Sequence, residues 1–333
     1  MPTSELWTHK AANARLHFVT GKGGTGKSTA AAALALTLAA GGRRVLLAEV
    51  EGRQGIAQLF DIPPLPYAET KVASADGGGE VRALAIDIEA AFLEYLDMFY
   101  NLGLAGRAMR KVGAVEFATT LAPGLRDVIL TGKIKECVIR REKDGRPTFD
   151  AVVVDAPPTG RIGTFLDVTK AMADLAKSGP IRSQSEGVVR LLHSDETVVH
   201  VVTLLESLPV QESIDAIEEL RAKELRIGSI IVNRTNSMHL PEGMLDAAAQ
   251  GELDRDAARE GLKRAGLRLS DEDFDGLLTQ ASEYAIRTQA QRESARELEA
   301  IDIPQLSLPT LTEGVDLGGL YELAEALANQ GVK

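Results

Sequence analysis

A glycine- and lysine-rich loop near the amino terminus constrains the fold more than any other feature of this sequence. The nine residues Gly21-Lys22-Gly23-Gly24-Thr25-Gly26-Lys27-Ser28-Thr29 follow the apolar run 16–20 and precede an alanine-rich segment. Glycines let backbone N–H groups turn inward around an anion, and a helix that begins after the loop points its positive end at the same place. A strand, this loop and a helix in that order predict a Walker A loop, which binds the phosphates of a nucleotide.

Two of the lysines in this loop predict different roles. Lys27 is expected to reach the β- and γ-phosphates of ATP, while Ser28 ligates the accompanying Mg²⁺. Lys22 is not needed in an ordinary Walker A loop and marks the deviant form. In that class the second lysine reaches across a dimer interface and stabilises negative charge on the partner's nucleotide. The alternative for Lys22 is a solvated surface lysine.

Extended apolar runs recur along the chain with helical patterns between them. Two of these runs, at 152–154 and 230–232, are apolar on both faces, which is typical of central strands in a covered parallel sheet. We therefore expect an α/β fold, a P-loop NTPase with a doubly wound, mostly parallel sheet. The expected strands are 16–20, 43–50, 81–88, 149–155, 197–205, 227–233 and 305–308.

Three segments exceed what a minimal fold of this kind needs. Helical patterns occupy about 89–140 and 161–196, and an alanine- and charge-rich helical segment covers about 241–300. We interpret the whole chain, 1–333, as a single P-loop ATPase domain that carries these segments as insertions. The glycine-rich stretch at 76–79 is interpreted as a turn, and Ala30–Ala40 as a buried helix.

Two acidic positions follow predicted strands, in two segments that we predict to be switches: the first switch at 49–55 and the second switch at 155–161, where a turn can sense the γ-phosphate. Asp155 ends an apolar strand and begins the sequence Asp-Ala-Pro-Pro-Thr-Gly-Arg, so it is the candidate to hold Mg²⁺; a helix N-cap is the alternative. Glu51 follows the second strand and is the candidate that orients the attacking water. Glu49 lies two residues earlier and is the reserve candidate, and either glutamate could instead be a surface charge.

Composition excludes several other classes of protein. The chain has 333 residues, a formal net charge of -11, 4% aromatic residues and one cysteine, Cys137. An acidic chain with few aromatic rings is poorly suited to binding nucleic acid. One cysteine excludes an internal disulfide, a cysteine zinc site and the two-cysteine cluster site of an electron-transfer ATPase, and it suits a reducing compartment. With no signal peptide and no spanning segment expected, we predict a cytoplasmic location.

Residues at four places together resemble one known family. They are the deviant loop at Lys22–Ser28, the Asp155-Ala-Pro-Pro-Thr-Gly segment, the later Ile230-Ile-Val-Asn233, and the turn at Leu308-Pro309-Thr310-Leu311. In this order they resemble the arsenical-pump ATPase family, which includes the eukaryotic ATPase that targets tail-anchored proteins. The resemblance implies that Thr29 joins Lys27 and Ser28 at the phosphate and Mg²⁺. It also implies that Asn233 reads the adenine and that Pro309 and Thr310 pack beside it.

The sequence departs from that family at three points. Glu51 stands where the family's first switch carries an aspartate, which moves the carboxylate by about one methylene. The Cys-x-x-Cys zinc clasp of the eukaryotic targeting ATPase is absent, so no zinc is expected. The cysteines with which arsenical-pump ATPases sense metalloids are absent as well, which argues against metalloid activation.

The resemblance predicts a dimeric ATPase motor that couples its nucleotide state to a client or partner protein. The dimer is a homodimer or a heterodimer with a paralogous subunit, and the client a helical apolar segment or a membrane-protein partner. Two alternatives remain: the motor subunit of an anion-efflux system, and a nucleotide-binding module of a heteromeric complex with little hydrolysis of its own. The candidate client surface, or else plain helix core, comprises Phe92, Tyr95, Leu96, Met98, Phe99, Leu102, Met109, Phe117, Leu166, Met172 and Leu175.

Overall fold

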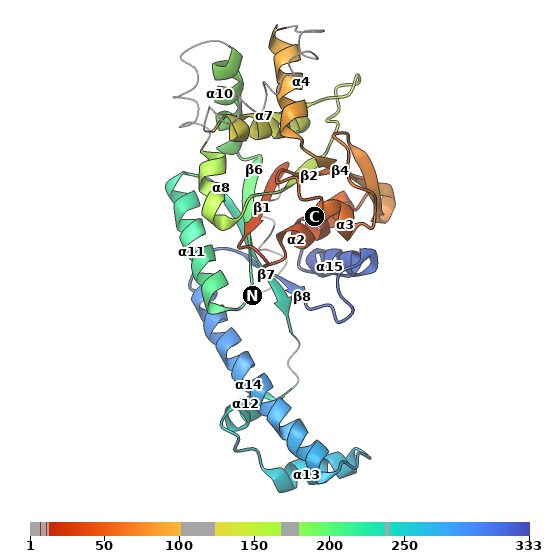
Figure 1. Cartoon of the computed structure of the whole chain (residues 1–333), viewed down its shortest axis with the longest axis vertical. Helices are drawn as coiled ribbons and strands as arrows, with labels where there is room; N and C mark the ends of the chain where they lie inside the picture. Colours follow the sequence, from red (N-terminus) through yellow and green to blue (C-terminus); the bar gives the residue numbers. More distant parts are fainter. Residues whose placement is uncertain (1–6, 8–10, 12, 101–123, 168–179, 237–239) are drawn as a thin grey trace.

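The computed structural model describes residues 7, 11, 13–100, 124–167, 180–236 and 240–333. In these ranges the chain forms an eight-stranded sheet with helices on both faces (Figure 1). The strands are β1 (Leu16–Gly21), β2 (Arg44–Glu49), β3 (Thr70–Ala75), β4 (Gly79–Ala85), β5 (Ala151–Asp155), β6 (Thr197–Thr203), β7 (Ile227–Thr235) and β8 (Gln305–Pro309). The helices are α2 (Lys27–Ala39), α3 (Gly55–Leu59), α4 (Ile88–Tyr100), α7 (Leu125–Ile139), α8 (Thr159–Leu166), α10 (Pro180–Leu192), α11 (Ser207–Ala222), α12 (Glu242–Ala249), α13 (Arg255–Arg264), α14 (Asp271–Glu299) and α15 (Leu317–Asn329).

The strand order confirms the doubly wound α/β prediction. The order is β3-β4-β2-β5-β1-β6-β7-β8, and every neighbouring pair is parallel except β3 with β4. β1 lies between β5 and β6, so the chain leaves β1 at the point where the winding of the sheet reverses. Ligands of open α/β sheets bind at the carboxyl ends of the strands at such a point.

The antiparallel edge strand β3 was missed by the sequence analysis. Its residues Thr-Lys-Val-Ala-Ser-Ala are mostly small or polar and only partly buried, so they carry no apolar strand pattern. A short 3-10 turn, Asp76–Gly78, joins β3 to β4 and confirms the predicted glycine turn. At Gly79 any Cβ would lie 1.8 Å from the carbonyl oxygen of Ala39, so this close approach of two backbones requires glycine.

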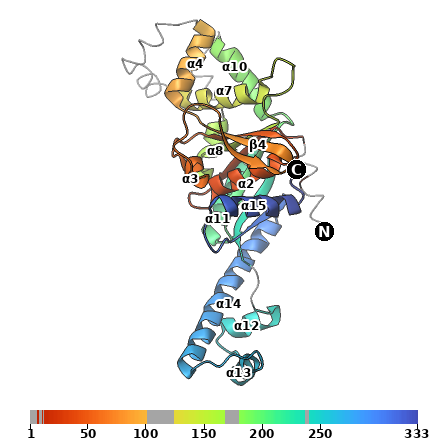
Figure 2. The same cartoon turned by 90° about the vertical axis from the view of Figure 1, so that its right-hand side faces the viewer.

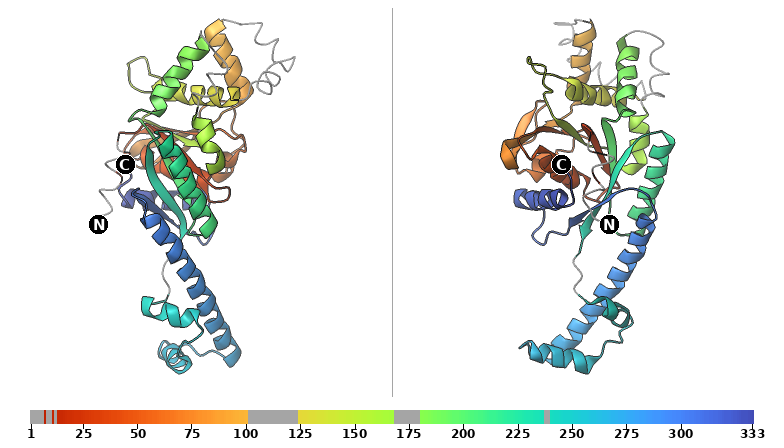
Figure 3. Two further views of the ribbon diagram at one scale, coloured as in Figure 1. Left: turned by 90° about the vertical axis from the view of Figure 1, so that its left-hand side faces the viewer. Right: turned by 180° about the vertical axis from the view of Figure 1, so that it is seen from behind.

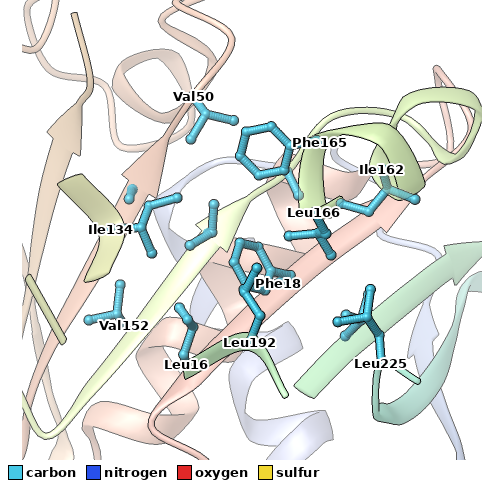
Figure 4. Packing of buried hydrophobic residues seen from close by; sticks show 14 of the residues in the cluster. Leu16, Phe18, Val50, Ile134, Val152, Ile162, Phe165, Leu166, Leu192 and Leu225 are labelled. Atoms are coloured by element: carbon cyan, nitrogen blue, oxygen red, sulfur yellow. The ribbon is translucent and has the colours of Figure 1, made fainter. Parts of the chain in front are cut away.

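Alternate residues of each strand pack into two separate cores, one on each face of the sheet. Leu16, Phe18 and Val152 face the core that α7, α8, α10 and α11 cover, where Phe18 meets Phe165 edge to face at 6.4 Å (Figure 4). Val19 and the neighbouring inner strands face α2 and α15 on the other side. The predicted buried alanine helix is confirmed, because every residue of α2 from Ala30 to Ala39 is buried.

The first two predicted insertions lie together beyond one end of the sheet. α4, α7 and α10 gather there in all the views, with α8 beside the sheet below them (Figures 1 and 2). Phe92 packs partly buried against the main core, and Leu166 is buried in it, so these members of the candidate client surface serve as core. Residues 101–123 and 168–179, with Leu102, Met109, Phe117, Met172 and Leu175, lie outside the described residues.

The third predicted segment forms an arm that projects from the other end of the sheet. α14 extends away from the sheet, and α12 and α13 lie beside the part of α14 that is farthest from the sheet (Figure 3). Ser270 caps α14 by accepting a hydrogen bond from the N–H of Asp273. Within the described ranges, each helix is too short or too polar to serve as a membrane-spanning segment.

Candidate nucleotide site

The glycine loop lies at the carboxyl end of β1, where the sheet topology places a ligand site. Gly24 and Gly26 both adopt left-handed backbone conformations, with φ of 88° and 87°. At Gly26, a Cβ would also lie 2.3 Å from Nδ2 of Asn233, so glycine is required there on two counts. α2 begins immediately at Lys27, so the free N–H groups of its first turn lie beside the loop.

One side chain of the loop itself and one from β7 hold the loop in shape. Thr25, which is buried, donates its Oγ1 hydrogen to the carbonyl oxygen of Lys22 at 2.8 Å. Asn233 at the end of β7 donates from Nδ2 to the carbonyl oxygen of Thr25, also at 2.8 Å. The Oδ1 of Asn233 accepts from the N–H of Arg234 at 2.9 Å. Asn233 thus supports the loop directly, a structural task that its sequence position did not reveal.

Ser28 and Asp155, the two predicted Mg²⁺ residues, lie in direct contact. The Oγ of Ser28 donates to Oδ2 of Asp155 at 2.6 Å, while Oδ1 of Asp155 is buried with no partner among the described residues. Burial raises the pKa of Asp155 to about 6, Ser28 and Lys27 oppose this shift, and Glu49 adds to it. The helix-cap alternative for Asp155 is wrong, because the N-cap of α8 is Pro158.

Glu49 lies beside Asp155 on the neighbouring strand. The two residues are register partners in the β2–β5 pairing, and Glu49 is only 2% exposed. Its Oε1 accepts from the N–H of Gly55 at 3.2 Å, but its Oε2 is buried without a partner in the described part of the chain. Two buried, unused carboxylate oxygens next to a serine hydroxyl fit Mg²⁺, which takes one or two protein ligands besides water and phosphate.

Glu51 lies on the loop that follows β2 and contacts two arginines. Its Oε2 is 3.6 Å from Arg53 Nη2, and its Oε1 is 3.7 Å from Nη1 of Arg161 in α8. The side chain is 17% exposed, so it is neither buried like Glu49 nor fully solvated. Contact with Arg161 joins the loop after β2 to the segment after β5, which are the two predicted switches.

The two loop lysines occupy different surroundings. Lys22 forms an ion pair with Glu212 of α11, with 2.7 Å between Nζ and Oε1. Lys27 has no ion-pair partner among the described residues, although its charge acts on Asp155. In this conformation Lys22 is therefore held by its own chain, and Lys27 is the cation left available to phosphate.

The residues predicted to lie around the base come together at the ends of β7 and β8. The N–H of Thr310 donates to the carbonyl oxygen of Thr235 at 2.9 Å, and Pro309 is the register partner of Thr235. A cavity of about 200 Å³ opens beside them, between the end of β7 and the root of the arm. It is lined by Leu205, Thr235, Asn236, Tyr284, Thr288, Gln291, Arg292 and Ala295.

Several contacts of this site could not be found from sequence alone. Thr20 donates to the carbonyl oxygen of Pro157 at 2.6 Å and so fixes the second switch to β1, but no motif marks it. Glu212 has no sequence signal either, because it is one of several acids on an ordinary helix. Arg161 does belong to the quoted sequence that begins at Asp155. An arginine in a predicted switch was therefore a signal that the sequence offered.

Comparison with known proteins adds an independent finding. The family model for anion-transporting ATPases matches residues 14–179, a range that contains the loop, Asp155 and both predicted switches. The chain is 67% identical over 327 residues to the ATPase BagA of Mycobacterium tuberculosis, covering 98% of this chain and 96% of that protein.

More distant similarities extend to two further groups of ATPases. An arsenical pump-driving ATPase of Acidiphilium multivorum is 24% identical over 335 residues, 92% of this chain and 53% of that protein. The ATPase GET3 of Kluyveromyces lactis is 22% identical over 260 residues, 68% of this chain and 73% of that protein. One relative is similar to this chain along nearly its full length, and the family model matches as well. Together these two findings show which family the chain belongs to.

Proposed function

The chain belongs to the anion-transporting ATPase family that includes arsenical pump-driving ATPases and the ATPase GET3, and from that premise we propose that it is a dimeric, ATP-hydrolysing motor. In this proposal the nucleotide state controls binding of a client or partner protein. The observation that carries the proposal is the contact of Ser28 with Asp155 beside Glu49, which leaves two buried carboxylate oxygens unused at the end of a phosphate-binding loop.

The loop residues supply the binding of the triphosphate. Backbone N–H groups of the loop and of the first turn of α2 donate to phosphate oxygens, and Lys27 neutralises charge on the β- and γ-phosphates. Ser28 and Asp155 would hold Mg²⁺, and Glu49 lies beside Asp155 on the neighbouring strand. The bound cation, when present, supplies positive charge that stabilises the leaving phosphate.

Glu51 and Lys22 act on the reacting atoms in this proposal. Glu51 orients the attacking water once its carboxylate is released from Arg53 and Arg161. Lys22 leaves Glu212 and stabilises charge on the nucleotide of a second subunit, so hydrolysis requires a dimer. Asn233, Pro309 and Thr310 hold the adenine end, with the amide of Asn233 also supporting the loop.

The dimer and its client belong to the same proposal. The second subunit is either an identical chain or a paralogue, since a glutamate at position 51 fits an asymmetric pair. The helical segments around α4, α7 and α10 form the side that meets a helical apolar client or a membrane-protein partner. We expect the motor in the cytoplasm, because a single buried cysteine suits a reducing compartment.

Light scattering combined with phosphate release tests this proposal. The mass of the full chain is measured with ATP·Mg²⁺, with ADP·Mg²⁺ and without nucleotide. We expect a dimer and turnover with ATP, and loss of both in Lys22→Ala. The matched control is Lys143→Ala, at an exposed lysine far from the loop. Turnover by a monomer that is indifferent to Lys22→Ala contradicts the trans role of that lysine.

A nucleotide-binding module with little hydrolysis is the second candidate. The observation that favours it is that both carboxylate oxygens of Glu51 face arginines, at 3.6 and 3.7 Å, so neither is turned towards a water at the phosphates. Under this alternative, ATP binds and protects the loop, but phosphate release stays at background until a paralogous subunit is added. Turnover by the purified chain alone excludes it.

A further inference from the structure

A strap of irregular chain, residues 61–69, joins the nucleotide site to the helices at the end of the sheet. It follows α3 and leads into β3 at Thr70. Leu65, in its middle, is 5% exposed and belongs to the core under α2. Leu65 is the buried residue of this otherwise more exposed strap, and outside a sheet its backbone polar groups need partners of another kind.

The side chain of Gln54 satisfies both backbone groups of Leu65. The N–H of Leu65 donates to Oε1 of Gln54 at 2.7 Å, and Nε2 of Gln54 donates to the carbonyl oxygen of Leu65 at 3.2 Å. One carboxamide thus takes the place of a neighbouring strand. Asparagine would be one methylene shorter, and alanine would leave both buried groups without partners.

The backbone of Gln54 lies beside the Mg²⁺ side of the site. Gln54 adopts a left-handed conformation with φ of 56°, which is uncommon for a residue with a side chain and marks a constrained turn. The next residue, Gly55, donates its N–H to Glu49, and a Cβ on Gly55 would lie 3.6 Å from Oγ of Ser28. Movement of Glu49 therefore acts on the turn that carries Gln54, and Ser28 lies close beside that turn.

The other end of the strap is bound to α4 and α7. The hydroxyl of Tyr67 donates to Oε2 of Glu94 in α4 at 2.5 Å. Lys133 of α7 donates to both oxygens of Glu94 at 3.0 Å, and its Nζ lies 5.4 Å from the centre of the Tyr67 ring. Burial and the hydrogen bond to Glu94 both raise the pKa of Tyr67, so this hydroxyl remains a donor.

A second ion pair attaches the strap to α7. Glu69 at the end of the strap accepts from Arg140, which follows the last residue of α7. Arg140 also lies 3.5 Å from Glu136. Lys133 is only 12% exposed and Arg140 is 32% exposed, so both cations are partly withdrawn from solvent.

We infer that Gln54 is a positioning residue that couples the nucleotide site to α4 and α7 through the bonds of its carboxamide to the strap. A nucleotide that displaces the Glu49–Gly55 contact moves Gln54, and Leu65, Tyr67 and Glu69 transmit the movement to the two helices. The inference rests on the proposed function only in requiring that nucleotide binds at the loop. It connects the first switch, the loop after β2, to α4 and α7 by a route that does not pass through α8.

Hydrogen exchange of the full chain, with and without ATPγS·Mg²⁺, tests this inference. In the wild type we expect nucleotide to change the exchange of the loop peptide 21–30 and also that of α7. In Gln54→Ala, the loop peptide keeps its response while the response of α7 is lost. Loss of two hydrogen bonds also makes the strap exchange roughly tenfold faster in that variant.

Matched variants separate coupling from a merely structural role. The control is Gln58→Ala on α3, whose exposed side chain has no hydrogen-bond partner among the described residues. It should behave as wild type. Tyr67→Phe keeps the ring under Lys133 but removes the donor to Glu94, so it should weaken the response of α7 even if Gln54→Ala fails to fold.

The outcomes distinguish the inference from the proposed function. A loop response together with an unchanged α7 response in both Gln54→Ala and Tyr67→Phe overturns the inference alone. A wild-type chain whose loop responds while α7 does not also overturns it alone. Absence of any loop response in the wild type overturns nucleotide binding and, with it, the inference.

Discussion

The two ends of strand β1 carry buried polar clusters with opposite properties. At the carboxyl end, Asp155 and Glu49 keep buried oxygens without partners among the described residues. Towards the amino end, His17 and His200 are also buried, yet every ring nitrogen of the pair has a partner. Both clusters lie on the same sheet, so the difference is one of chemistry rather than of location.

The histidine cluster is a closed set of hydrogen bonds. One assignment satisfies it: His17 Nε2 donates to Ala14 O at 3.1 Å, His200 Nε2 donates to His17 Nδ1 at 3.1 Å, and Ser229 Oγ donates to His200 Nδ1 at 2.8 Å. Trp7 stacks on both rings, with centroids at 6.0 and 5.3 Å, and its own Nε1 is buried without a partner among the described residues. The satisfied ring nitrogens of the two histidines indicate a structural role, while two unused carboxylate oxygens on neighbouring strands indicate a place for a cation.

Removal of Lys27 should give the largest effect of the series, a loss of ATP turnover without a loss of stability. Lys27→Ala takes away the cation that faces the phosphates, so ATP turnover should fall by about 10³-fold, or about 4 kcal/mol. Phosphate release measures this effect, and thermal unfolding should show little change. Lys143→Ala is the control at an exposed lysine. A large loss of stability in Lys27→Ala would remove the contrast between the two ends of β1.

Truncation of Trp7 should do the reverse and act on stability alone. Trp7 is 2% exposed and stacks on the histidine pair, so Trp7→Ala should lower the free energy of unfolding by about 3–4 kcal/mol. Urea unfolding measures the loss, and Trp7→Phe should recover part of it. Nucleotide affinity of the folded variant should stay within about twofold of wild type. A weaker affinity would connect the two ends of the strand.

Acid should destabilise the histidine end. Burial lowers the pKa of His17 from 6.5 to about 4, and burial also lowers the pKa of His200. A lowered pKa in the folded state contributes stability above pH 6.5 that is lost as the pH falls towards 4, by about 2–3 kcal/mol for His17. Unfolding free energies at pH 7 and pH 5 measure this loss. The control His193→Gln, at an exposed histidine, should leave the difference between the unfolding free energies at pH 7 and pH 5 unchanged.

Asp155 should have the smallest effect on stability, and its dependence on pH should have the opposite sign to that of the histidines. Its pKa is raised from 3.8 to about 6, chiefly by burial, so the charged carboxylate costs stability that returns as the pH falls through 6 towards 3.8. Asp155→Asn should therefore raise the free energy of unfolding at pH 7 by about 1–2 kcal/mol, the smallest change in stability of the series, and it should also lower turnover. The gain should vanish below about pH 4.

The matched control for this variant is Asp302→Asn, at an exposed aspartate. It should change neither stability nor turnover. If Asp155→Asn destabilises the chain at pH 7, then the carboxylate is a structural group, like the histidines at the other end of β1. The unused oxygen Oδ1 would then no longer indicate a cation site.

Local sequence was sufficient for the parts of the site that depend on backbone geometry. The loop 21–29, the start of α2 and the strand that ends at Asp155 were predicted, because glycine content, strand pattern and helix pattern are local signals. The edge strand β3 was not predicted, because a strand at the edge of a sheet can pair with its one neighbour without having an apolar face.

Contacts between distant segments were out of reach of the sequence. Lys22 with Glu212 and Gln54 with Leu65 join surface-type residues that no periodic pattern distinguishes. The hydrogen bond between His17 and His200 depends on the register of β1 against β6, which no local pattern gives.

By itself, the sequence determined that this chain folds around a phosphate loop and which charged residues stand near it. Glycines, strand periods and a motif act over a few residues, so they can be identified without a fold. Only the tertiary structure decided which buried oxygens stay unused and which polar groups are satisfied. Those properties depend on neighbours that are distant in sequence, as Ser28 and Asp155 are, and they distinguish a site from a core.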